Sequence, residues 1–285
     1  MIRKTMSLNQ DCIGIIAGGG QFPLLFIEAA HQAGRKVFVV AHRSETDERV
    51  AQAADQVCWV KLGQLGKIIR FFKQSGVFEA VFLGTITKTQ IFRDVLPDLK
   101  GLSLWNKIDI RQDDAILRAV AEALEQANIK VLESTLYLEH LLFPKGVLTR
   151  KKPTKNQRQD IEFGWRNARA IGSLDIGQCV VVRDCAVMAV EAIDGTDATI
   201  LRGGRLASEQ AVVVKVRKPN QDFRFDLPAT GIGTIKAIRE TKGSVLAVEA
   251  GQSLLFDRQE MIAAADAAKI VVVGVEERQD GTLEF

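Results

Sequence analysis

Asp222, Arg224 and Asp226 carry the clearest potential chemistry in this sequence, because they alternate with Phe223 and Phe225 directly before a Leu-Pro pair. Alternate side chains of an extended chain share a face, so this spacing predicts a strand with three charges on one side and two phenylalanines in the core. Two carboxylates so placed can hold Mg²⁺ or activate a water, and an arginine between them can neutralise phosphoryl charge. An exposed edge strand running into a turn is the alternative interpretation.

The residues that follow favour a functional site. Gly231 and Gly233 lead into a helix that the pattern predicts over residues 230–241, and a helix N-terminus presents free N–H groups to a phosphate. Basic side chains also lie just upstream of the charged segment. The substrate contacts expected from this region are Lys215, Lys218, Gln221, Arg224 and Thr234.

A second candidate cluster lies earlier in the same half of the chain. Thr196 and Asp197 stand at the start of a helix predicted over residues 196–206, and Arg202 follows Asp197 too far along for an ordinary i,i+4 pair. An acid, a hydroxyl and a base near a loop can bind a phosphorylated ligand, whereas a capped helix with a glycine end explains the same residues without one. Both interpretations stay open, and Thr196 and Arg202 are candidate substrate contacts.

A glycine triplet, Gly18–Gly20, follows the apolar run at residues 12–17. Glycines at this place let the backbone approach a phosphate, as in dinucleotide-binding folds, but Phe22 stands in the region where that fingerprint needs its third glycine. Arg43 could meet the 2′-phosphate of NADP, which leaves an NADP-dependent oxidoreductase as an alternative. Otherwise the triplet and Gln21 form an anion- or sugar-binding loop of another kind, or only a tight turn.

Gly84 and Thr85 end another apolar run, at residues 79–84. In open α/β sheets ligands bind at the carboxyl edge of the strands, so both residues are candidate substrate contacts. A threonine that caps the next helix is an equally good explanation.

The elements that must position these residues are visible in the first half as apolar runs alternating with helical patterns. The sequence predicts strands over residues 12–17, 36–41, 56–60, 79–84 and 129–133, and helices over 22–33, 46–54, 64–75 and 113–127. Near-continuous apolar strands alternating with helices are typical of a parallel sheet covered on both faces. Residues 1–135 are therefore expected to form a Rossmann-like, doubly wound parallel-sheet domain.

The rhythm then changes. Prolines, glycine and dense charge predict a linker over residues 136–153. A second α/β domain with a mixed sheet is expected over residues 154–285, where it carries Asp226. Its predicted elements are a helix over 156–171, a hairpin within 177–193, helices over 196–206, 230–241 and 258–268, and strands over 211–216, 244–250 and 269–275.

Composition limits the possible functions. The 285 residues are 47% hydrophobic and 26% charged with a net charge of +3, which is typical of a folded protein and does not indicate nucleic acid as a partner. The four cysteines and three histidines are scattered, so any metal is expected to be a hard cation such as Mg²⁺. No apolar run reaches about 18 residues and the first residues lack a signal core, so we expect a cytoplasmic protein.

Eight lysines and arginines stand between Lys145 and Arg169, against two acidic residues. A solvated linker and an exposed helix face explain this composition. The alternative is a basic surface that faces phosphate or anionic lipid head groups, which would give peripheral contact with the inner face of the inner membrane.

Five stretches carry a family resemblance: GIIAGGGQFP, SLDIGQ, EAIDGTDATILRGG, KVRKPNQDFRFDLPATGIGTI and VLAVEAG. In this order, from about residue 13 to residue 270, they closely resemble the UDP-2,3-diacylglucosamine pyrophosphatase family of lipid A biosynthesis, the type distinct from the metallophosphoesterase that performs the same step. The resemblance implies magnesium-dependent hydrolysis of the pyrophosphate bond to UMP and 2,3-diacylglucosamine 1-phosphate, or lipid X. It also implies two domains that clasp the substrate, water attack at the sugar-side phosphorus, an essential Asp226 and a homodimer.

The leading hypothesis is therefore a hydrolase that acts on a small-molecule lipid nucleotide. Asp226 is either a metal ligand or the base that orients water, and Asp197 and Asp222 are candidate co-ligands of Mg²⁺. A non-catalytic binding protein for nucleotide sugars or lipid phosphates is the third hypothesis, beside the hydrolase and the NADP-dependent oxidoreductase.

Overall fold

The computed structural model describes residues 11–43, 45–86, 98, 101, 113–219, 221–225 and 227–285. The chain forms two compact units: unit 1 comprises Met1–Glu139 with Asp222–Asp226, and unit 2 comprises His140–Gln221 with Leu227–Phe285. The chain therefore passes between the units three times, where a single linker would need only one passage. Within the described residues, no helix is both long and apolar enough to cross a membrane.

Unit 1 is built on a parallel sheet in the order β3-β2-β1-β4-β5. Its strands are β1 (Cys12–Ala17), β2 (Lys36–His42), β3 (Gln56–Val60), β4 (Glu79–Leu83) and β5 (Lys130–Val131). Its helices are α1 (Phe22–Gln32), α2 (Arg49–Ala53), α3 (Leu65–Gln74) and α6 (Asp113–Gln126). The strand order reverses between β1 and β4, which confirms the predicted doubly wound, Rossmann-like fold.

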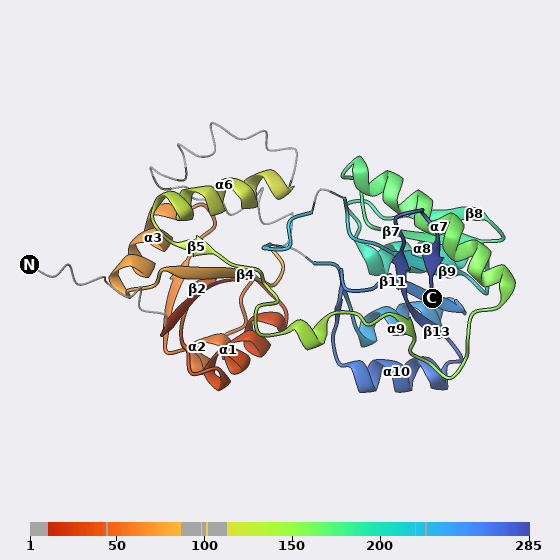
Figure 1. The fold of residues 1–285 in the computed structure, drawn as a ribbon, viewed down its shortest axis with the longest axis horizontal. Helices are drawn as coiled ribbons and strands as arrows, with labels where there is room; N and C mark the ends of the chain where they lie inside the picture. Colours follow the sequence, from red (N-terminus) through yellow and green to blue (C-terminus); the bar gives the residue numbers. More distant parts are fainter. Residues whose placement is uncertain are drawn as a thin grey trace, which may run out of the picture. The chain divides into compact units, whose positions relative to one another are not determined.

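Helices cover both faces of this sheet, which is why its strands are almost continuously apolar. In Figure 1, α3 and α6 lie on one face and α1 and α2 on the other. Phe72 of α3 and Leu124 of α6 share one buried cluster with Phe38 and Phe82 of the strands. Phe225, from far along the chain, belongs to the same cluster.

Unit 2 contains a mixed sheet in the order β14-β13-β11-β9-β7-β8, with β6 also paired to β13. Its strands are β6 (Gly146–Val147), β7 (Cys179–Arg183), β8 (Ala186–Val190), β9 (Val212–Lys215), β11 (Val245–Glu249), β13 (Val271–Glu277) and β14 (Leu283–Glu284). The short strands β10 (Ala229–Thr230) and β12 (Leu254–Leu255) form a separate pair. The predicted mixed sheet in the second half of the chain is confirmed.

The residues predicted as a linker, 136–153, are divided between the units. A short 3-10 helix, η1 (Glu139–Leu141), stands at the division, and β6 joins the second sheet through its antiparallel pairing with β13. Thr154 then starts α7 (Lys155–Ser173) with a capping box: its hydroxyl accepts from the Gln157 N–H, and the Gln157 side chain accepts from the Thr154 N–H.

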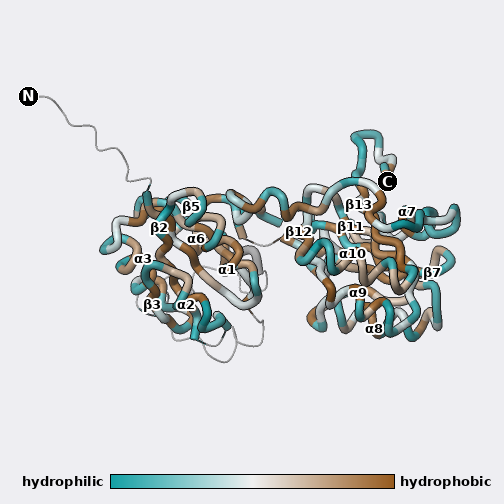
Figure 2. Tube along the Cα trace, turned by 90° about the horizontal axis from the view of Figure 1, so that it is seen from below, coloured by the Kyte–Doolittle hydropathy of each residue, from teal (hydrophilic) through white to brown (hydrophobic). Residues whose placement is uncertain are grey.

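The second sheet is also covered on both faces (Figure 1). On one face, Ile161 and Trp165 of α7 pack against Val180 and Val214. The opposite face carries α8 (Thr196–Ala207), α9 (Ile232–Glu240) and α10 (Arg258–Ala267). Figure 2 shows the strands between these helices as hydrophobic and α7 as mostly hydrophilic, as expected for a helix with one buried stripe.

Four strands of unit 2 end at one edge of the sheet. β9, β11 and β13 are parallel, and β8 points the same way because both β8 and β9 are antiparallel to β7. Charged residues stand at these strand ends: Glu191 directly after β8, Lys215 on β9, Glu249 on β11 and Glu277 on β13. This carboxyl edge is where an open α/β sheet binds ligands.

Candidate functional site

The charged segment at Asp222–Phe225 is a turn, so the predicted strand is wrong. The N–H of Phe225 donates to the carbonyl of Asp222 at 3.1 Å, and the N–H of Arg224 donates to the Asp222 carboxylate at 3.0 Å. An aspartate that accepts hydrogen bonds from nearby backbone N–H groups favours a turn over the hydrogen-bonded pairing of a β-strand. The expected alternation of faces is lost with the strand: Phe225 is buried, whereas Phe223 is only half-buried.

This turn packs on unit 1. The ring of Phe225 meets that of Phe82 edge-on, with centroids 5.2 Å apart and an interplanar angle of 87°. The Ser134 hydroxyl donates to the carbonyl of Phe223 at 3.2 Å. The segment that we expected as part of the second domain is therefore held in the core of the first.

Asp222 and Arg224 neutralise each other within the turn. The Arg224 Nε lies 3.1 Å from both carboxylate oxygens of Asp222, and its Nη2 lies 2.8 Å from Oδ2. The hydrogen bonds from Arg224 lower the pKa of Asp222 below its ordinary value. Arg224 also pairs with Glu125 at 3.0 Å, so its predicted phosphate contact competes with two carboxylates. Asp226, the predicted catalytic residue, lies outside the described residues.

Two helices of unit 2 present their N-termini side by side. A Cβ added to Gly233, in the first turn of α9, would lie 3.9 Å from Oδ2 of Asp197, in the first turn of α8. At the opposite ends, a Cβ added to Gly204 would lie 2.2 Å from Oγ1 of Thr241. The two helices therefore run in the same direction, and their positive dipole ends favour an anion at one place.

Lys215 lies buried close to the start of α9. Its Nζ donates to the carbonyl of Ala229 at 2.7 Å. The buried thiol of Cys179 is influenced by several charged residues of this edge. Burial is the main reason that its pKa is raised; the charges of Glu191 and Asp197 raise the pKa further, and that of Lys215 lowers it. A buried cation beside two helix N-termini makes this edge suitable for a phosphate.

Glu191 is a buried residue at this edge that sequence reasoning missed. Its carboxylate accepts from the Thr196 hydroxyl at 2.8 Å and from the Gln178 N–H at 3.1 Å. Thr196, a predicted substrate contact, therefore orients Glu191 or is oriented by it. The available signal was the tetrapeptide AVEA, which occurs at residues 189–192 and 247–250 and ends an apolar strand with an acid both times.

Two other predicted contacts of unit 2 have protein partners. Arg202 donates to Oδ2 of Asp194 at 2.9 Å, and Lys218 pairs with Oδ1 of Asp175 at 2.7 Å. Gln221 and Thr234 are buried. The predicted residues that gather around the two helix starts and the end of β9 are Thr196, Asp197, Lys215 and Thr234.

The glycine triplet of unit 1 is tied to the loop after β4. Gly18 donates to the last carbonyl of β4 at 2.8 Å, Gly19 donates to the carbonyl of Thr85 at 2.7 Å, and Thr85 donates back to Gly19 at 3.1 Å. A Cβ added to Gly18 would lie 2.4 Å from the Thr85 oxygen, so this close approach requires a glycine. The Gly18 and Gly19 amides are thus used within the protein, whereas Gly20 and Gln21 are exposed.

The neighbouring strand end in unit 1 is closed by buried polar groups. The Nδ1 of His42 lies 3.0 Å from the carbonyl of Ala17, and the Thr46 hydroxyl donates to the same oxygen at 2.6 Å. Burial lowers the pKa of His42 from its ordinary value of 6.5. Gly84 completes the loop with φ +86°.

The residues expected to bind a metal fit that role unequally. Among the described residues, no three His, Cys, Asp or Glu side chains gather to hold an ion. Asp222 does not fit, because both its oxygens accept from Arg224. Asp197 is exposed in the first turn of α8, and Asp226 lies outside the part of the chain that is described. Magnesium binding stays a prediction that depends on Asp197 and Asp226.

Fold and site together define a class: an α/β protein of two units, with a doubly wound parallel sheet in one and an anion-favouring strand edge in the other. Residues 12–141 match the family model of the LpxI N-terminal domain, and residues 144–273 match that of the LpxI C-terminal domain. The chain belongs to the LpxI family, which confirms the resemblance seen in the sequence.

The chain is similar to the UDP-2,3-diacylglucosamine pyrophosphatase LpxI of Caulobacter vibrioides, with 32% identity over 280 residues that cover 94% of this chain and 98% of that protein. Pyruvate carboxylase of Rhizobium etli shares 14% identity over 43% of this chain and 11% of its own, with a TM-score of 0.25. N5-carboxyaminoimidazole synthetase of Staphylococcus aureus shares 15% identity over 77% of this chain and 48% of its own, with a TM-score of 0.26. Structural likeness this low carries no argument, and these comparisons support neither the oxidoreductase nor the non-catalytic alternative.

Proposed function

We propose that this chain hydrolyses the pyrophosphate bond of UDP-2,3-diacylglucosamine in lipid A biosynthesis and releases UMP and lipid X. The observation that carries the proposal is the family match: both LpxI domains occur in order along the chain. The Caulobacter protein named for this activity is 32% identical over 94% of the chain.

The anion-favouring edge of unit 2 supports the proposal. A pyrophosphate diester carries two negative charges, and charge grows on the leaving phosphate in the transition state. Lys215 and the N-termini of α8 and α9 offer positive potential that is already in place, because Lys215 is buried and its Nζ is fixed by the carbonyl of Ala229. We assign the diphosphate of the substrate to this edge.

In the proposed reaction, a water oxygen forms a bond to the sugar-side phosphorus, and the bond from that phosphorus to the bridging oxygen breaks. UMP leaves with the bridging oxygen, and the water proton passes to Asp226 and on to solvent. If Asp226 ligates metal instead, the proton passes directly to solvent. When bound, Mg²⁺ neutralises charge on the phosphoryl oxygens, and Asp197 and Asp226 are the residues proposed to hold it.

Hydrolysis in H₂¹⁸O tests both the activity and the site of attack. Purified protein with UDP-2,3-diacylglucosamine and Mg²⁺ should form lipid X that contains ¹⁸O and UMP that does not, as read by mass spectrometry. Label in UMP would move the attack to the uridine-side phosphorus. Absence of UMP would refute the hydrolase.

Two perturbations test the proposed roles of Asp226 and magnesium. Asp226→Ala should keep the wild-type circular dichroism and unfolding midpoint but lose about 10²–10⁴-fold in turnover, as expected when a general base is removed. Near-normal turnover by this variant would remove Asp226 from the chemistry. Excess chelator should stop the wild-type reaction, and activity that persists in chelator would remove the metal.

Peripheral contact with an anionic membrane and a homodimer complete the proposal. The basic stretch at residues 145–169 supports the membrane contact, although Lys145 is paired with Glu276 at 2.7 Å and Arg150 with Asp266 at 3.6 Å. Flotation with vesicles that contain phosphatidylglycerol tests the membrane contact, and light scattering tests the homodimer. Protein that stays unbound, or a monomer mass, would overturn the corresponding part.

A further inference from the structure

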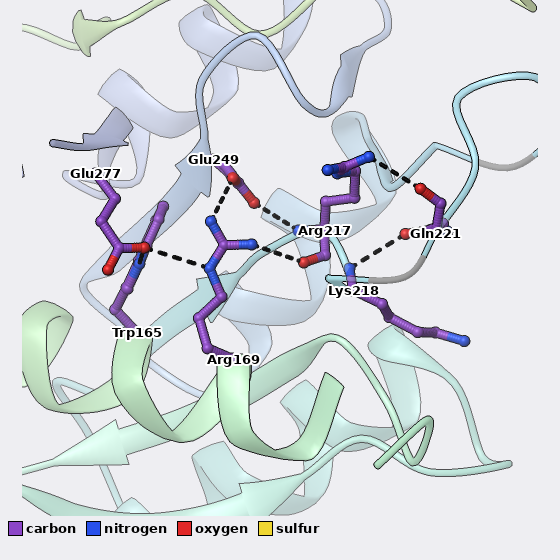
Figure 3. A network of polar contacts seen from close by, with 7 residues as sticks. All are labelled: Trp165, Arg169, Arg217, Lys218, Gln221, Glu249 and Glu277. Carbon is purple, nitrogen blue, oxygen red and sulfur yellow. Dashed lines mark hydrogen bonds and ion pairs between the residues drawn. The ribbon is translucent and has the colours of Figure 1, made fainter. Parts of the chain in front are cut away.

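The chain that leads into the Asp222 segment is fixed by two charged side chains of unit 2 (Figure 3). Oε2 of Glu249 accepts from the N–H of Arg217 at 2.7 Å, and Nη1 of Arg169 donates to the carbonyl of Arg217 at 3.0 Å. Nη2 of Arg169 lies 2.6 Å from Oε1 of Glu249. One ion pair therefore holds both backbone polar groups of a single residue, and we call Arg169 with Glu249 the Arg217 clamp.

The Arg217 clamp continues the sheet where backbone pairing stops. Val248 of β11 pairs with Lys215 of β9 as the last pair of that ladder. Glu249 is the next residue of β11, and its side chain accepts the Arg217 N–H. Backbone groups that leave a sheet in the protein interior need partners, and here a carboxylate and a guanidinium supply them.

Further contacts immobilise the clamp itself. The Arg169 guanidinium lies 5.3 Å from the ring centroid of Trp165, and its Nε lies 3.5 Å from Oε2 of Glu277. The Trp165 Nε1 donates to the same oxygen at 2.9 Å. The Glu249 side chain is only 9% exposed. The Arg169 side chain is 27% exposed. An ion pair that is mostly buried adds little stability over an apolar pair of the same size, so we expect this pair to contribute more to geometry than to stability.

The same set of bonds extends from Arg217 to Gln221 (Figure 3). Nη1 of Arg217 donates to the carbonyl of Gln221 at 2.9 Å. The Gln221 N–H donates to the carbonyl of Lys218 at 3.0 Å, and the Lys218 N–H donates to Oε1 of Gln221 at 3.3 Å. Gln221 is buried and is the last residue of unit 2 before Asp222.

The return of the chain to unit 2 is fixed as well. Lys215 donates to the carbonyl of Ala229, and the N–H of Leu254 donates to the carbonyl of Pro228, both at 2.7 Å. Ala229 also pairs with Leu254 between β10 and β12. The chain on both sides of Asp222–Asp226 is therefore bonded within unit 2.

We infer that Arg169 and Glu249 are positioning residues for the hydrolysis, acting through Arg217–Gln221 on the segment that ends in Asp226. This inference rests on the proposed function, in which Asp226 acts on the water or on the metal. Gln221 is joined directly to Asp222, so the clamp fixes the point at which the segment begins, and catalytic rate is sensitive to displacements of about 1 Å. Neither residue of the clamp is itself assigned a substrate contact, but Lys218 and Gln221, which follow Arg217, are predicted ones. Loss of the clamp should therefore lower kcat much more than it raises KM.

Arg169→Lys and Glu249→Gln test this role. Lysine cannot reproduce the planar fork that reaches both Glu249 and the Arg217 carbonyl, and glutamine removes the charge that orients Arg169. In both variants kcat should fall about 100-fold, while KM for UDP-2,3-diacylglucosamine should rise by less than about tenfold. The matched control is Arg205→Lys, because Arg205 pairs with Glu240 at 3.8 Å on the exposed surface of the same unit. Its kcat should stay within about twofold of wild type.

Hydrogen exchange separates positioning from a general loss of stability. Both variants should lose amide protection in a peptide spanning residues 217–225, while peptides from β7 and β11 exchange as in the wild type. Protection lost throughout the sheet would instead assign the clamp a merely structural role and overturn the inference.

The outcomes distinguish this inference from the function on which it rests. Wild-type protein that forms no UMP refutes the proposed function. Active wild type with unchanged kcat in both variants overturns the positioning role alone. If neither variant folds, exchange of the Arg217 amide in the wild type decides: strong protection supports the clamp, and exchange as fast as in an unstructured peptide overturns it.

Discussion

Replacing Phe225 by alanine should release the charged segment from unit 1. The Phe225 side chain is only 5% exposed and meets Phe82 edge-on in the core cluster formed with α3 and α6. Two other contacts of the described segment are weaker: Ser134 donates one neutral hydrogen bond to Phe223, and the Arg224–Glu125 pair has side chains 32% and 45% exposed. Among the described contacts of the segment within unit 1, the ring of Phe225 therefore contributes most.

The magnitude follows from that burial. A buried Phe→Ala change costs about 3–5 kcal/mol, whereas one neutral hydrogen bond contributes about 1 kcal/mol and an exposed ion pair less than about 1 kcal/mol. A loss of about 3 kcal/mol shifts the docking equilibrium by roughly 150-fold. Phe225→Leu keeps most of the apolar volume and should cost less than about 1.5 kcal/mol.

Urea unfolding and turnover of UDP-2,3-diacylglucosamine measure the two consequences. Phe225→Ala should lower the free energy of unfolding of unit 1 and reduce kcat/KM on the order of 100-fold, as expected for misplaced catalytic groups. Phe78→Ala is the matched control, because Phe78 belongs to the same unit and is 39% exposed. It should lower the free energy of unfolding by less than Phe225→Ala does, because less of its ring is buried. Wild-type unfolding and turnover in Phe225→Ala would refute the docking role of this ring.

Three further predictions concern the strand edges. Lys215→Met keeps the length of the side chain but removes its charge and its hydrogen bond to the Ala229 carbonyl. The value of kcat/KM should therefore fall about 10²–10³-fold, with an unchanged circular dichroism spectrum. Wild-type kinetics would show that Lys215 is not part of the site. Because burial lowers the pKa of His42 below 6.5, the unfolded state binds more protons than the folded state, and the free energy of unfolding should fall as pH drops through and below about 6.5. His42→Gln should flatten that dependence in urea titrations at pH 5.5 and 7.5, and an unaltered slope would contradict the assignment. Gly84→Ala should lower the free energy of unfolding by about 2 kcal/mol, because φ is +86° and the added Cβ would lie 2.3 Å from the Gly19 carbonyl oxygen. The urea midpoint should fall accordingly, and an unchanged midpoint would contradict this prediction.

The fold class was predictable because its signal is local. Strands buried on both faces must be apolar along their whole length, and the helices that cover them must carry one apolar stripe. Runs such as residues 12–17 and 269–275 meet the first requirement, and their order along the chain defines a doubly wound sheet and a mixed sheet. Family membership was equally visible, since its motifs are continuous stretches of sequence.

The candidate site was only partly predictable. Lys215, Thr196 and Asp197 follow strands or begin helices, so their place at the carboxyl edge of a sheet could be inferred from order alone. Glu191 and Glu249 carry the same sequence signal, an acidic residue at the end of an apolar strand. An ordinary exposed glutamate gives the same signal, so the two cases differ only when the hydrogen-bond partners are known. Those partners lie far away in sequence, as Arg169 and Arg217 do for Glu249.

The sequence by itself determined the two α/β units, the family and the residue types available for phosphate chemistry. Only the tertiary structure decided that Asp222–Phe225 is a turn and that Phe225 packs in the core of unit 1. The physical reason is that alternating charged and phenylalanine residues show that the phenylalanine side chains can be buried, but they do not show which part of the protein they pack against. Phe82 and Ser134 supply that surface from a distant part of the chain, and hydrogen bonds between Asp222 and Arg224 remove the extended backbone on which alternation depends.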